Sequence, residues 1–282
     1  MSCRSILIAF AIALVAIVPS FATTVYVVAD NDNLYTIDPT TGATTVVGNM
    51  GVEMTDIALS NGVMFGVSFP ATGADSLYLI DPNTGATTLV GSTGVFLNAL
   101  QFGPDGTTLY AAGGSPGCGP PPHSTACNTL YTINTTTGAA TFVGTGTYNS
   151  SGDLEFNNSL YLTSATSSTD QLFTVDPTTG AGTAVGDTGY AQVYGLAYVS
   201  ETGTLYGFND VGNNVIAINT GTGAGTFVAN YSDSFEILGA ATAAVPEPRS
   251  AGIMVVGFGV LVGGLVRRKL RKQGLDMASS VK

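Results

Sequence analysis

Short apolar stretches alternate with polar residues along the central part of the chain, and this pattern predicts β-strands. Residues 34–37, 77–80 and their later counterparts are short, largely apolar stretches bounded by polar residues, as is typical of strands with a buried face. β-branched residues and glycine dominate, and no stretch sustains the 3.6-residue period of a helix. The sequence therefore predicts an all-β domain over residues 23–244.

One hairpin motif recurs five times in this domain. Copies that align without gaps cover residues 34–48, 77–91, 130–144, 172–186 and 215–229. Each copy joins two alternating stretches by a short turn. In the first copy the turn runs from Asp38 through Pro39 to Gly42, and Asp-Pro at the start with glycine at the end favours a tight hairpin turn. The third and fifth turns keep the glycine but lack the proline.

A second, weaker hairpin lies between successive copies, so each period of 42 to 53 residues holds four predicted strands. Four antiparallel strands per repeat of this length are typical of a β-propeller blade. Residues 25–28 lack a first strand before them, and residues 236–239 match a first strand with none after it. Pairing these two segments completes a five-bladed β-propeller closed by N- and C-terminal strands. An open β-repeat array, or a larger ring closed by oligomerisation, is the alternative.

Residues 1–22 have the three parts of a secretory signal peptide. Arg4 supplies the positive charge, residues 6–18 form an apolar stretch, and Ser20 and Ala22 are small residues at the cleavage positions. Thirteen apolar residues span about 20 Å as a helix, which is short of the ~30 Å hydrocarbon core of a membrane. We expect signal peptidase to cleave after Ala22 and the protein to be exported.

The C-terminus has a second three-part pattern. Pro246, Glu247 and Pro248 precede an apolar predicted helix over residues 251–266, and a basic cluster follows over residues 267–272. An apolar helix ahead of basic residues is typical of a membrane-inserted segment with a cytoplasmic end, here the tail 273–282.

Residues 245–272 resemble the PEP-CTERM sorting signal of Gram-negative bacteria. The resemblance implies recognition by an exosortase, a membrane cysteine protease, followed by release or surface attachment, in bacteria that make exopolysaccharide and biofilm. A plain single-pass anchor is the alternative. The Leu-Tyr-x-Ile-Asp and Thr-Gly units of the repeats also resemble bacterial cell-surface propeller proteins, which implies the fold alone.

Charge is distributed very unevenly along the chain. There is no Lys or Arg between Thr23 and Pro248, and every acidic residue except Asp276 lies in that stretch. An exported domain without cations repels phosphate backbones, so nucleic-acid binding is excluded. Nucleotide cofactors are disfavoured for the same reason, and no phosphate-binding glycine loop with its lysine occurs.

Catalytic options in the predicted domain are few. His123 is the single histidine, and no Gly-x-Ser-x-Gly nucleophile motif occurs, which speaks against acyl transfer. Cys118 and Cys127 flank this histidine, and an exported protein favours a disulfide between them. A zinc site is the alternative, but the spacing matches no closed ligand set.

The repeat alignment points to a cluster of oxygen ligands. The position before each innermost strand is Asp56, Asn98, Asp153, Gly195 and Glu236. Innermost strands line the central channel of a propeller, so these side chains are expected at one mouth. Oxygen ligands suit Ca²⁺, whereas two carboxylates about 5–10 Å apart suit glycoside hydrolysis. The third interpretation is that they only bond loop amides.

Two further features are weighed in the same way. Residues 30–33 form an Asp-Asn-Asp-Asn tetrapeptide that lacks the glycine and glutamate of an EF-hand loop, so a solvated turn is favoured over a cation site. Tyrosines recur at equivalent strand positions, and packing between blades is favoured over a sugar-stacking platform. They are Tyr26, Tyr35, Tyr78, Tyr110, Tyr131, Tyr161 and Tyr206.

These observations predict an exported cell-surface or extracellular-matrix propeller with a binding or structural role. It would pass through the inner membrane by residues 251–266, and its partners would be signal peptidase, an exosortase-like protease, and exopolysaccharide or surface proteins. No cofactor is expected, and Ca²⁺ is the one candidate ion. The alternative is a carbohydrate-active enzyme that uses the channel-mouth carboxylates.

Overall fold

The computed structural model describes residues 24–68, 74–114, 127–231 and 234–242, and these residues form twenty strands. Contacts divide the chain into two units, Met1–Ala244 and Val245–Lys282, and all described residues belong to the first. The strands are β1 (Val25–Ala29), β2 (Asn33–Ile37), β3 (Thr44–Asn49), β4 (Met54–Ser60), β5 (Val63–Ser68), β6 (Ser76–Ile80), β7 (Thr87–Ser92), β8 (Phe96–Phe102), β9 (Leu109–Gly114), β10 (Thr129–Ile133), β11 (Ala140–Thr145), β12 (Ser150–Asn157), β13 (Ser159–Ala165), β14 (Asp170–Val175), β15 (Gly182–Asp187), β16 (Val193–Val199), β17 (Thr204–Asn209), β18 (Asn214–Ile218), β19 (Gly225–Asn230) and β20 (Ile237–Thr242).

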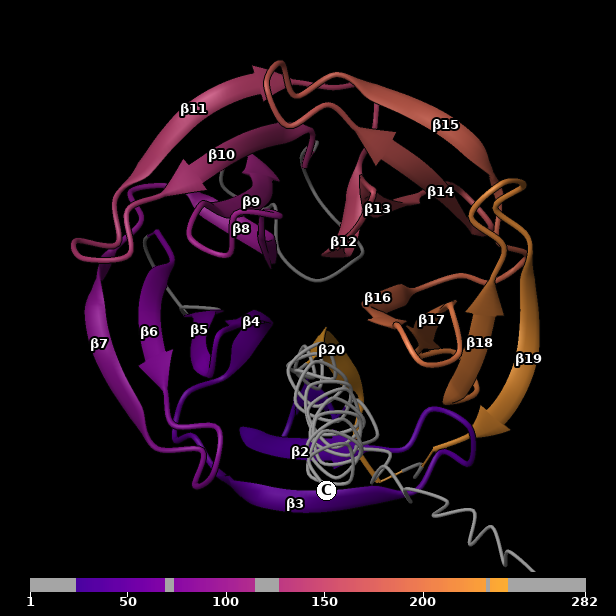
Figure 1. Ribbon diagram of the computed structural model, residues 1–282, viewed down its shortest axis with the longest axis horizontal. Coiled ribbons are helices and arrows are strands. Elements are labelled where there is room, and N and C mark those ends of the chain that lie inside the picture. Colours follow the sequence, from indigo (N-terminus) through magenta and orange to yellow (C-terminus); the bar gives the residue numbers. More distant parts are fainter. Residues whose placement is uncertain (1–23, 69–73, 115–126, 232–233, 243–282) are drawn as a thin grey trace, which may run out of the picture. The chain divides into compact units, whose positions relative to one another are not determined.

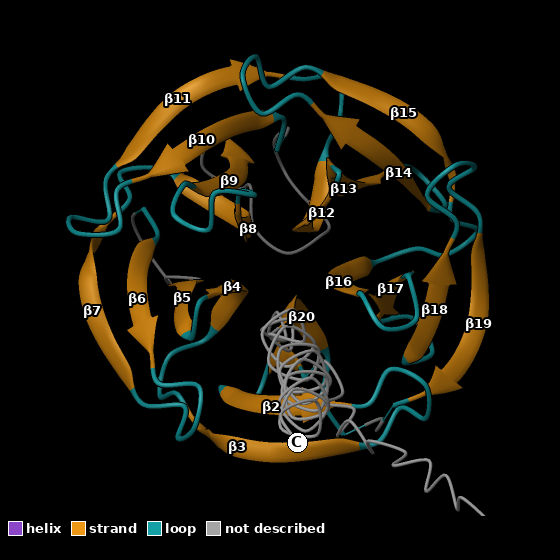
Figure 2. Ribbon diagram, viewed as in Figure 1, coloured by secondary structure: helices purple, strands orange, loops and turns teal. Residues whose placement is uncertain are grey.

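Five four-stranded antiparallel sheets surround a central axis, so the predicted five-bladed propeller is confirmed (Figure 1). Four blades use consecutive strands, β4–β7, β8–β11, β12–β15 and β16–β19, each running from the axis to the outer edge (Figure 2). The fifth blade has the order β20-β1-β2-β3. Because every blade has neighbours on both sides, the open array is excluded for this domain.

The ring closes by the pairing of β20 with β1. The register joins Val25 to Thr242 and Val28 to Gly239, with an irregularity next to Ala29. Ile237 is fully buried in this strand. The C-terminal end of the domain therefore supplies the innermost strand of the N-terminal blade, as the sequence predicted.

The repeated turns adopt the expected conformation. Gly42 has a φ of 74°, and its N–H donates to the Asp38 carbonyl at 2.8 Å. The Asp38 carboxylate accepts the Thr40 N–H at 2.9 Å. A positive φ is strained for residues with a Cβ, which explains why glycine ends all five turns.

The same turns connect one blade to the next. A Cβ added at Gly48 on β3 would lie 2.0 Å from the carbonyl oxygen of Thr84 in the following blade's turn. Equivalent contacts occur at Gly91, Gly144 and Gly186. The glycine that ends four of the five repeat copies therefore allows backbone-to-backbone packing between blades.

Five apolar clusters fill the spaces between blades. One joins Val27 of β1, Phe208 of β17 and Ile237 of β20, and thus spans the first and last described strands. Tyr35, Tyr161 and Tyr206 are buried in these clusters, and Tyr26, Tyr78, Tyr110 and Tyr131 are partly buried against them. The packing role predicted for the recurring tyrosines is confirmed.

Three predicted segments lie outside the described residues: the signal peptide 1–22, the sorting segment 245–272 with its tail 273–282, and the loop that holds Cys118 and His123. Among the residues that are described, no helix is long and apolar enough to span a membrane. The signal peptide, the sorting segment and the disulfide of Cys118 with Cys127 therefore remain predictions.

Candidate functional site

Every inner strand contains an irregularity in its pairing register. This irregularity determines which side chains lie at equivalent positions around the axis. The register shifts once in each inner pair, for example between Met54 and Asp56 in β4 and between Leu97 and Ala99 in β8. With the extra residue counted, the positions equivalent to Asp56 are Ala99, Asp153, Gly195 and Gly239. Two of the four predicted ligands, Asp56 and Asp153, therefore occupy the same position in the repeat.

Asp56 and Asp153 meet at the centre of the ring, and both are fully buried. Asp56 Oδ1 accepts the N–H of Ile57 at 2.7 Å, and its Oδ2 accepts the N–H of Leu100 at 2.6 Å. Asp153 Oδ2 accepts the N–H groups of Leu196 at 2.6 Å and Ala240 at 3.1 Å. The two carboxyls thus bind inner strands of all the other blades through backbone amides.

Burial and mutual proximity favour a single proton shared by these two carboxyls. Burial raises the pKa of both, and the charge of Asp56 raises the pKa of Asp153 further. A hydrogen bond between the side chains lowers the pKa of Asp56 and raises that of Asp153. Two carboxylates repel unless one keeps its proton, so Asp153 is the donor and Asp56 the acceptor. Asp153 Oδ2 accepts two amides and Oδ1 accepts none among the described residues, which leaves Oδ1 to carry the proton.

Limited space at the axis explains why only two of the five blades carry an aspartate at the position equivalent to Asp56. A Cβ added at Gly239 would lie 2.3 Å from Asp56 Oδ1. The other equivalent positions are Ala99 and Gly195, which also have small side chains. The side chains of Asp56 and Asp153 fill the centre, and their carboxyl groups accept hydrogen bonds from backbone amides of the inner strands.

Asn98 and Glu236 do not join this pair. Asn98 occupies the extra residue of its irregularity, equivalent to Thr55, and its Nδ2 donates to the Ser150 carbonyl at 2.9 Å. The N–H of Glu236 donates to Asp30 Oδ1 at 3.0 Å, and partial burial together with Asp210 and Asp30 raises the pKa of this glutamate. Among the described residues no group of three or more His, Cys, Asp or Glu side chains is placed to hold a metal.

Sequence reasoning missed two further buried carboxylates, Asp75 and Asp170. They precede or begin the third strands of their blades, and each reaches the first strand of the next blade. Asp75 Oδ2 accepts the N–H of Leu97, and Asp170 Oδ2 accepts that of Val193 at 2.8 Å. Burial raises the pKa of Asp75 to about 8 and of Asp170 to about 6. The sequence does contain a signal that could have located these two carboxylates, because both aspartates stand two residues before a repeat leucine.

A third missed carboxyl, Glu155, lies where the inner strands end. It is 3% exposed, and burial raises its pKa to about 8. Its Oε1 accepts the N–H of Phe156 at 2.9 Å, whereas Oε2 has no partner among the described residues. Gln101 holds the equivalent position in the neighbouring blade, and its Oε1 accepts the N–H of Phe102 at 2.8 Å.

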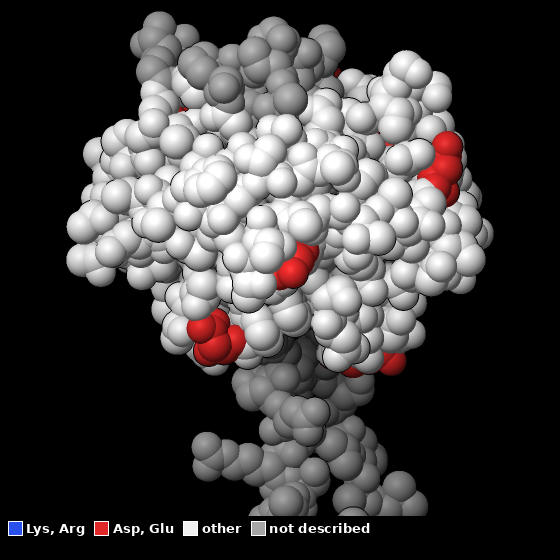
Figure 3. Space-filling view, turned by 90° about the horizontal axis from the view of Figure 1, so that it is seen from above, with Lys and Arg blue, Asp and Glu red and all other residues white. Residues whose placement is uncertain are grey.

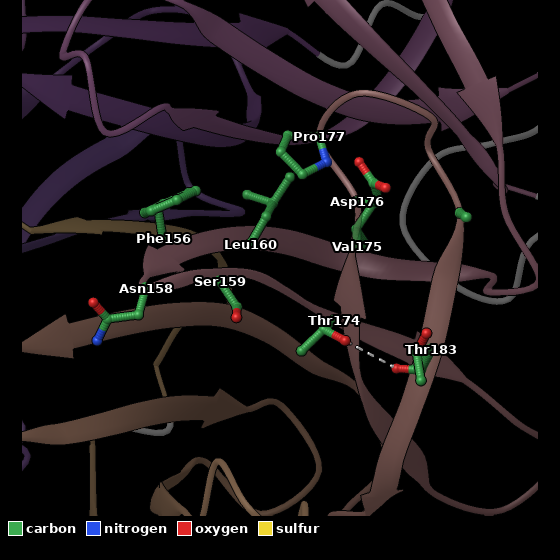
Figure 4. Close-up of a pocket in the computed structure, with 10 residues that line it drawn as sticks. Phe156, Asn158, Ser159, Leu160, Thr174, Val175, Asp176, Pro177 and Thr183 are labelled. Atoms are coloured by element: carbon green, nitrogen blue, oxygen red, sulfur yellow. Dashed lines mark hydrogen bonds between the residues drawn. The ribbon is translucent and has the colours of Figure 1, made fainter.

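Glu155 and Gln101 line a depression of about 400 Å³ at this end of the ring, with residues from β4, β8, β12 and β20. A second cavity of about 410 Å³ lies along the edge of the neighbouring hairpins of one blade (Figure 4). Leu160 and Pro177 are among its lining residues, and Thr174 Oγ1 donates to the Thr183 carbonyl at 3.5 Å beside it (Figure 4). Phe156 lines both cavities.

The described surface carries no basic side chain, and its acidic residues stand apart from one another on the face in Figure 3. The tetrapeptide 30–33 forms the turn between β1 and β2. There Asn31 Nδ2 donates to the Tyr35 hydroxyl at 2.9 Å, and Asp32 has a φ of 60°. The turn predicted for this segment is therefore confirmed.

No family model and no curated protein matches this chain. Among solved structures, one chain of a nidogen–laminin complex aligns with a TM-score of 0.54 at 9% identity, covering 79% of this chain and 98% of that chain. A protein from a study of the de novo evolutionary emergence of a symmetrical protein aligns with a TM-score of 0.48 at 17% identity, covering 76% and 96%. A provisionally assigned 6-phosphogluconolactonase of Bacteroides fragilis NCTC 9343 aligns with a TM-score of 0.45 at 14% identity, covering 79% and 98%. The first likeness shows the propeller fold and nothing of function.

Proposed function

We propose that this protein is an exported cell-surface or extracellular-matrix propeller with a binding or structural role. A signal peptide over residues 1–22 would start export. A PEP-CTERM-type segment with Pro246, Glu247 and Pro248 would present the chain to an exosortase-like protease. The three-part order of motif, apolar stretch and basic cluster supports this route.

The observation that carries the non-catalytic role is the state of the central carboxyls. Asp56 and Asp153 have no solvent-exposed surface, and three of their four oxygens accept backbone amides. A glycosidase needs its acid and its base or nucleophile in contact with the sugar. These groups instead stabilise the ring, so the enzymatic alternative gains no support from them.

The absence of basic residues also favours an exported scaffold over a phosphate-handling enzyme. The described residues hold no Lys or Arg to bind a phosphorylated substrate or stabilise a developing anion. Uncharged surface polymers and other surface proteins are the partners that such a domain accepts without repulsion.

The sorting part of the proposal is tested in a Gram-negative host that carries an exosortase. The mass of the surface-exposed protein is compared between the wild type and a Pro246→Ala/Glu247→Ala variant, with Asp276→Asn as a control in the tail. We expect the wild type and the control to lose residues C-terminal to the motif and the variant to keep them. Equal masses that retain residues 251–282 in all three would refute exosortase sorting.

A further inference from the structure

The depression lined by Glu155 and Gln101 lies where the inner strands end. Only these two of the five equivalent positions in the ring carry a polar side chain. The positions equivalent to Glu155 and Gln101 in the other three blades are Ala58, Ala197 and Ala241. Only two neighbouring blades therefore supply a polar side chain at this level, one a carboxyl and the other an amide. Nothing in the ring closure described above uses these two side chains.

Glu155 has hydrogen-bonding capacity that the described residues leave unused. Its Oε1 accepts the Phe156 N–H, and the backbone amide of Tyr198 also points to this carboxyl. Oε2 has no partner among the described residues although it is buried. Burial of a polar group without a hydrogen bond is unfavourable, so a hydrogen bond between Oε2 and a ligand would be stabilising.

The protonation state of Glu155 decides which ligands fit. Burial raises the pKa of Glu155 to about 8, which favours the neutral carboxyl at pH 7, and because Oε1 accepts an N–H the proton is expected on Oε2. The titratable groups around Glu155 include Asp153 on the same strand, Asp105 in the depression and Tyr161 opposite on β13. None of them is cationic, so nothing here would hold an anionic ligand.

Other lining groups suit a hydroxyl-rich molecule. Asn61 contributes an amide and Asp105 a carboxylate, and hydrogen bonds from Thr107 and Thr108 lower the pKa of Asp105. Phe156 offers an apolar ring edge or face. A neutral acid, two amides, a carboxylate and an aromatic ring together match the alternating hydroxyls and C–H faces of a sugar.

We propose that this depression binds a sugar unit of a neutral polysaccharide, with Glu155 and Gln101 as its central hydrogen-bonding pair. Its volume of about 400 Å³ falls within the range of ligand sites, about 300–1,000 Å³. Phe156 borders both this depression and the second cavity in Figure 4. The inference deepens the proposed binding role and does not depend on how the protein is sorted.

The test is isothermal titration calorimetry on the full chain in a detergent without a sugar headgroup. The probes are cellohexaose, laminarihexaose, maltohexaose and mannohexaose, with an alginate hexamer as the anionic comparison. We expect at least one neutral hexamer to bind at pH 6.5 and the alginate hexamer not to bind. Glu155→Ala should weaken that binding at least about 10-fold, the loss of one well-placed hydrogen-bonding group (1.4 kcal/mol is about tenfold).

Glu155→Gln separates a neutral hydrogen-bonding role from a charged one. The variant should bind within about threefold of the wild type at pH 6.5. Between pH 6.5 and 9.5 the wild type should weaken as its carboxyl ionises, and the variant should not. Glu53→Gln, a carboxyl that does not line the depression, is the matched control and should keep the wild-type pH dependence.

Three results would overturn the proposal: no hexamer binding at about 10 mM, the weak end of specific recognition; binding of the alginate hexamer alone; or wild-type affinity in Glu155→Ala. If circular dichroism shows that Glu155→Ala is unfolded, Gln101→Ala replaces it under the same criteria. Failure of sugar binding with normal processing of the C-terminus would leave the sorting proposal intact.

Discussion

Because Asp153 holds the shared proton and Asp56 accepts it, replacing each aspartate by asparagine should change the free energy of unfolding by a different amount. In Asp153→Asn, the remaining oxygen still accepts the N–H groups of Leu196 and Ala240, and the new NH₂ takes the place of Oδ1 and, like a protonated carboxyl, carries no charge. The free energy of unfolding at pH 7 should therefore stay within about 1 kcal/mol of the wild type, the scale of one exchanged hydrogen bond.

Asp56→Asn should be far more harmful. Both Asp56 oxygens accept backbone amides, at 2.7 and 2.6 Å, so an NH₂ in either place faces an N–H donor. One hydrogen bond to a charged group is lost, worth about 1.5–3 kcal/mol, and a buried amide is left unsatisfied, at about 1–3 kcal/mol. The expected destabilisation is about 3–5 kcal/mol.

Urea unfolding monitored by far-UV circular dichroism, from pH 5 to 8, measures both effects. In the wild type, the folded state keeps a proton that the unfolded chain loses above about pH 4, so stability should fall as pH rises. Asp153→Asn should make this slope shallower by the share of one proton, because Asp75 and Glu155 also retain protons that the unfolded chain loses. Asp32→Asn is the control, because at a φ of 60° asparagine replaces aspartate without strain. Equal destabilisation by Asp56→Asn and Asp153→Asn would refute this assignment of the proton.

Three further predictions concern the ring and its carboxyls. Deletion of residues 237–242 removes the inner strand of the closing blade and should lower Tm by about 10 °C or more in a thermal scan; a shift within about 2 °C would contradict closure by β20. Glu155→Gln should raise the free energy of unfolding at pH 7 by about 2 kcal/mol and change little at pH 4, because a pKa of about 8 makes the folded state retain a proton that the unfolded chain has lost. CaCl₂ should raise Tm no more than NaCl of equal ionic strength, because Asp56 and Asp153 are buried and three of their four oxygens accept backbone amides; a Ca²⁺-specific rise that Asp56→Asn removes would contradict this.

The repeat made most of the fold predictable from the sequence. Period-2 hydrophobicity and Asp-to-Gly turns are local signals, and they located the hairpins around Asp38 and its four counterparts. The unpaired strands at the two ends of the domain, such as the one that begins at Ile237, predicted how the ring closes.

The arrangement of the candidate site was only partly predictable. Repeat equivalence correctly paired Asp56 with Asp153, but the extra residue in each inner strand leaves no trace in hydropathy. Asn98 was therefore aligned one position away from its structural counterpart, and Glu236 lies three residues before the position that Gly239 occupies. Glu155 was missed because a polar residue between two apolar ones looks like an ordinary solvent-facing strand position.

The most direct test of the account is ¹³C NMR of the side-chain carboxyl carbons in the folded protein, titrated from pH 4 to 8. Asp153→Asn serves to assign the signal of the central pair. If these carboxyls are buried against the inner strands as described, the Asp153 carbon should keep the chemical shift of a protonated acid at pH 7, because burial and the charge of Asp56 raise its pKa. Ionisation of both central carboxyls below about pH 5, as for solvated aspartates, would contradict this buried pair and again favour a cation or catalytic site there.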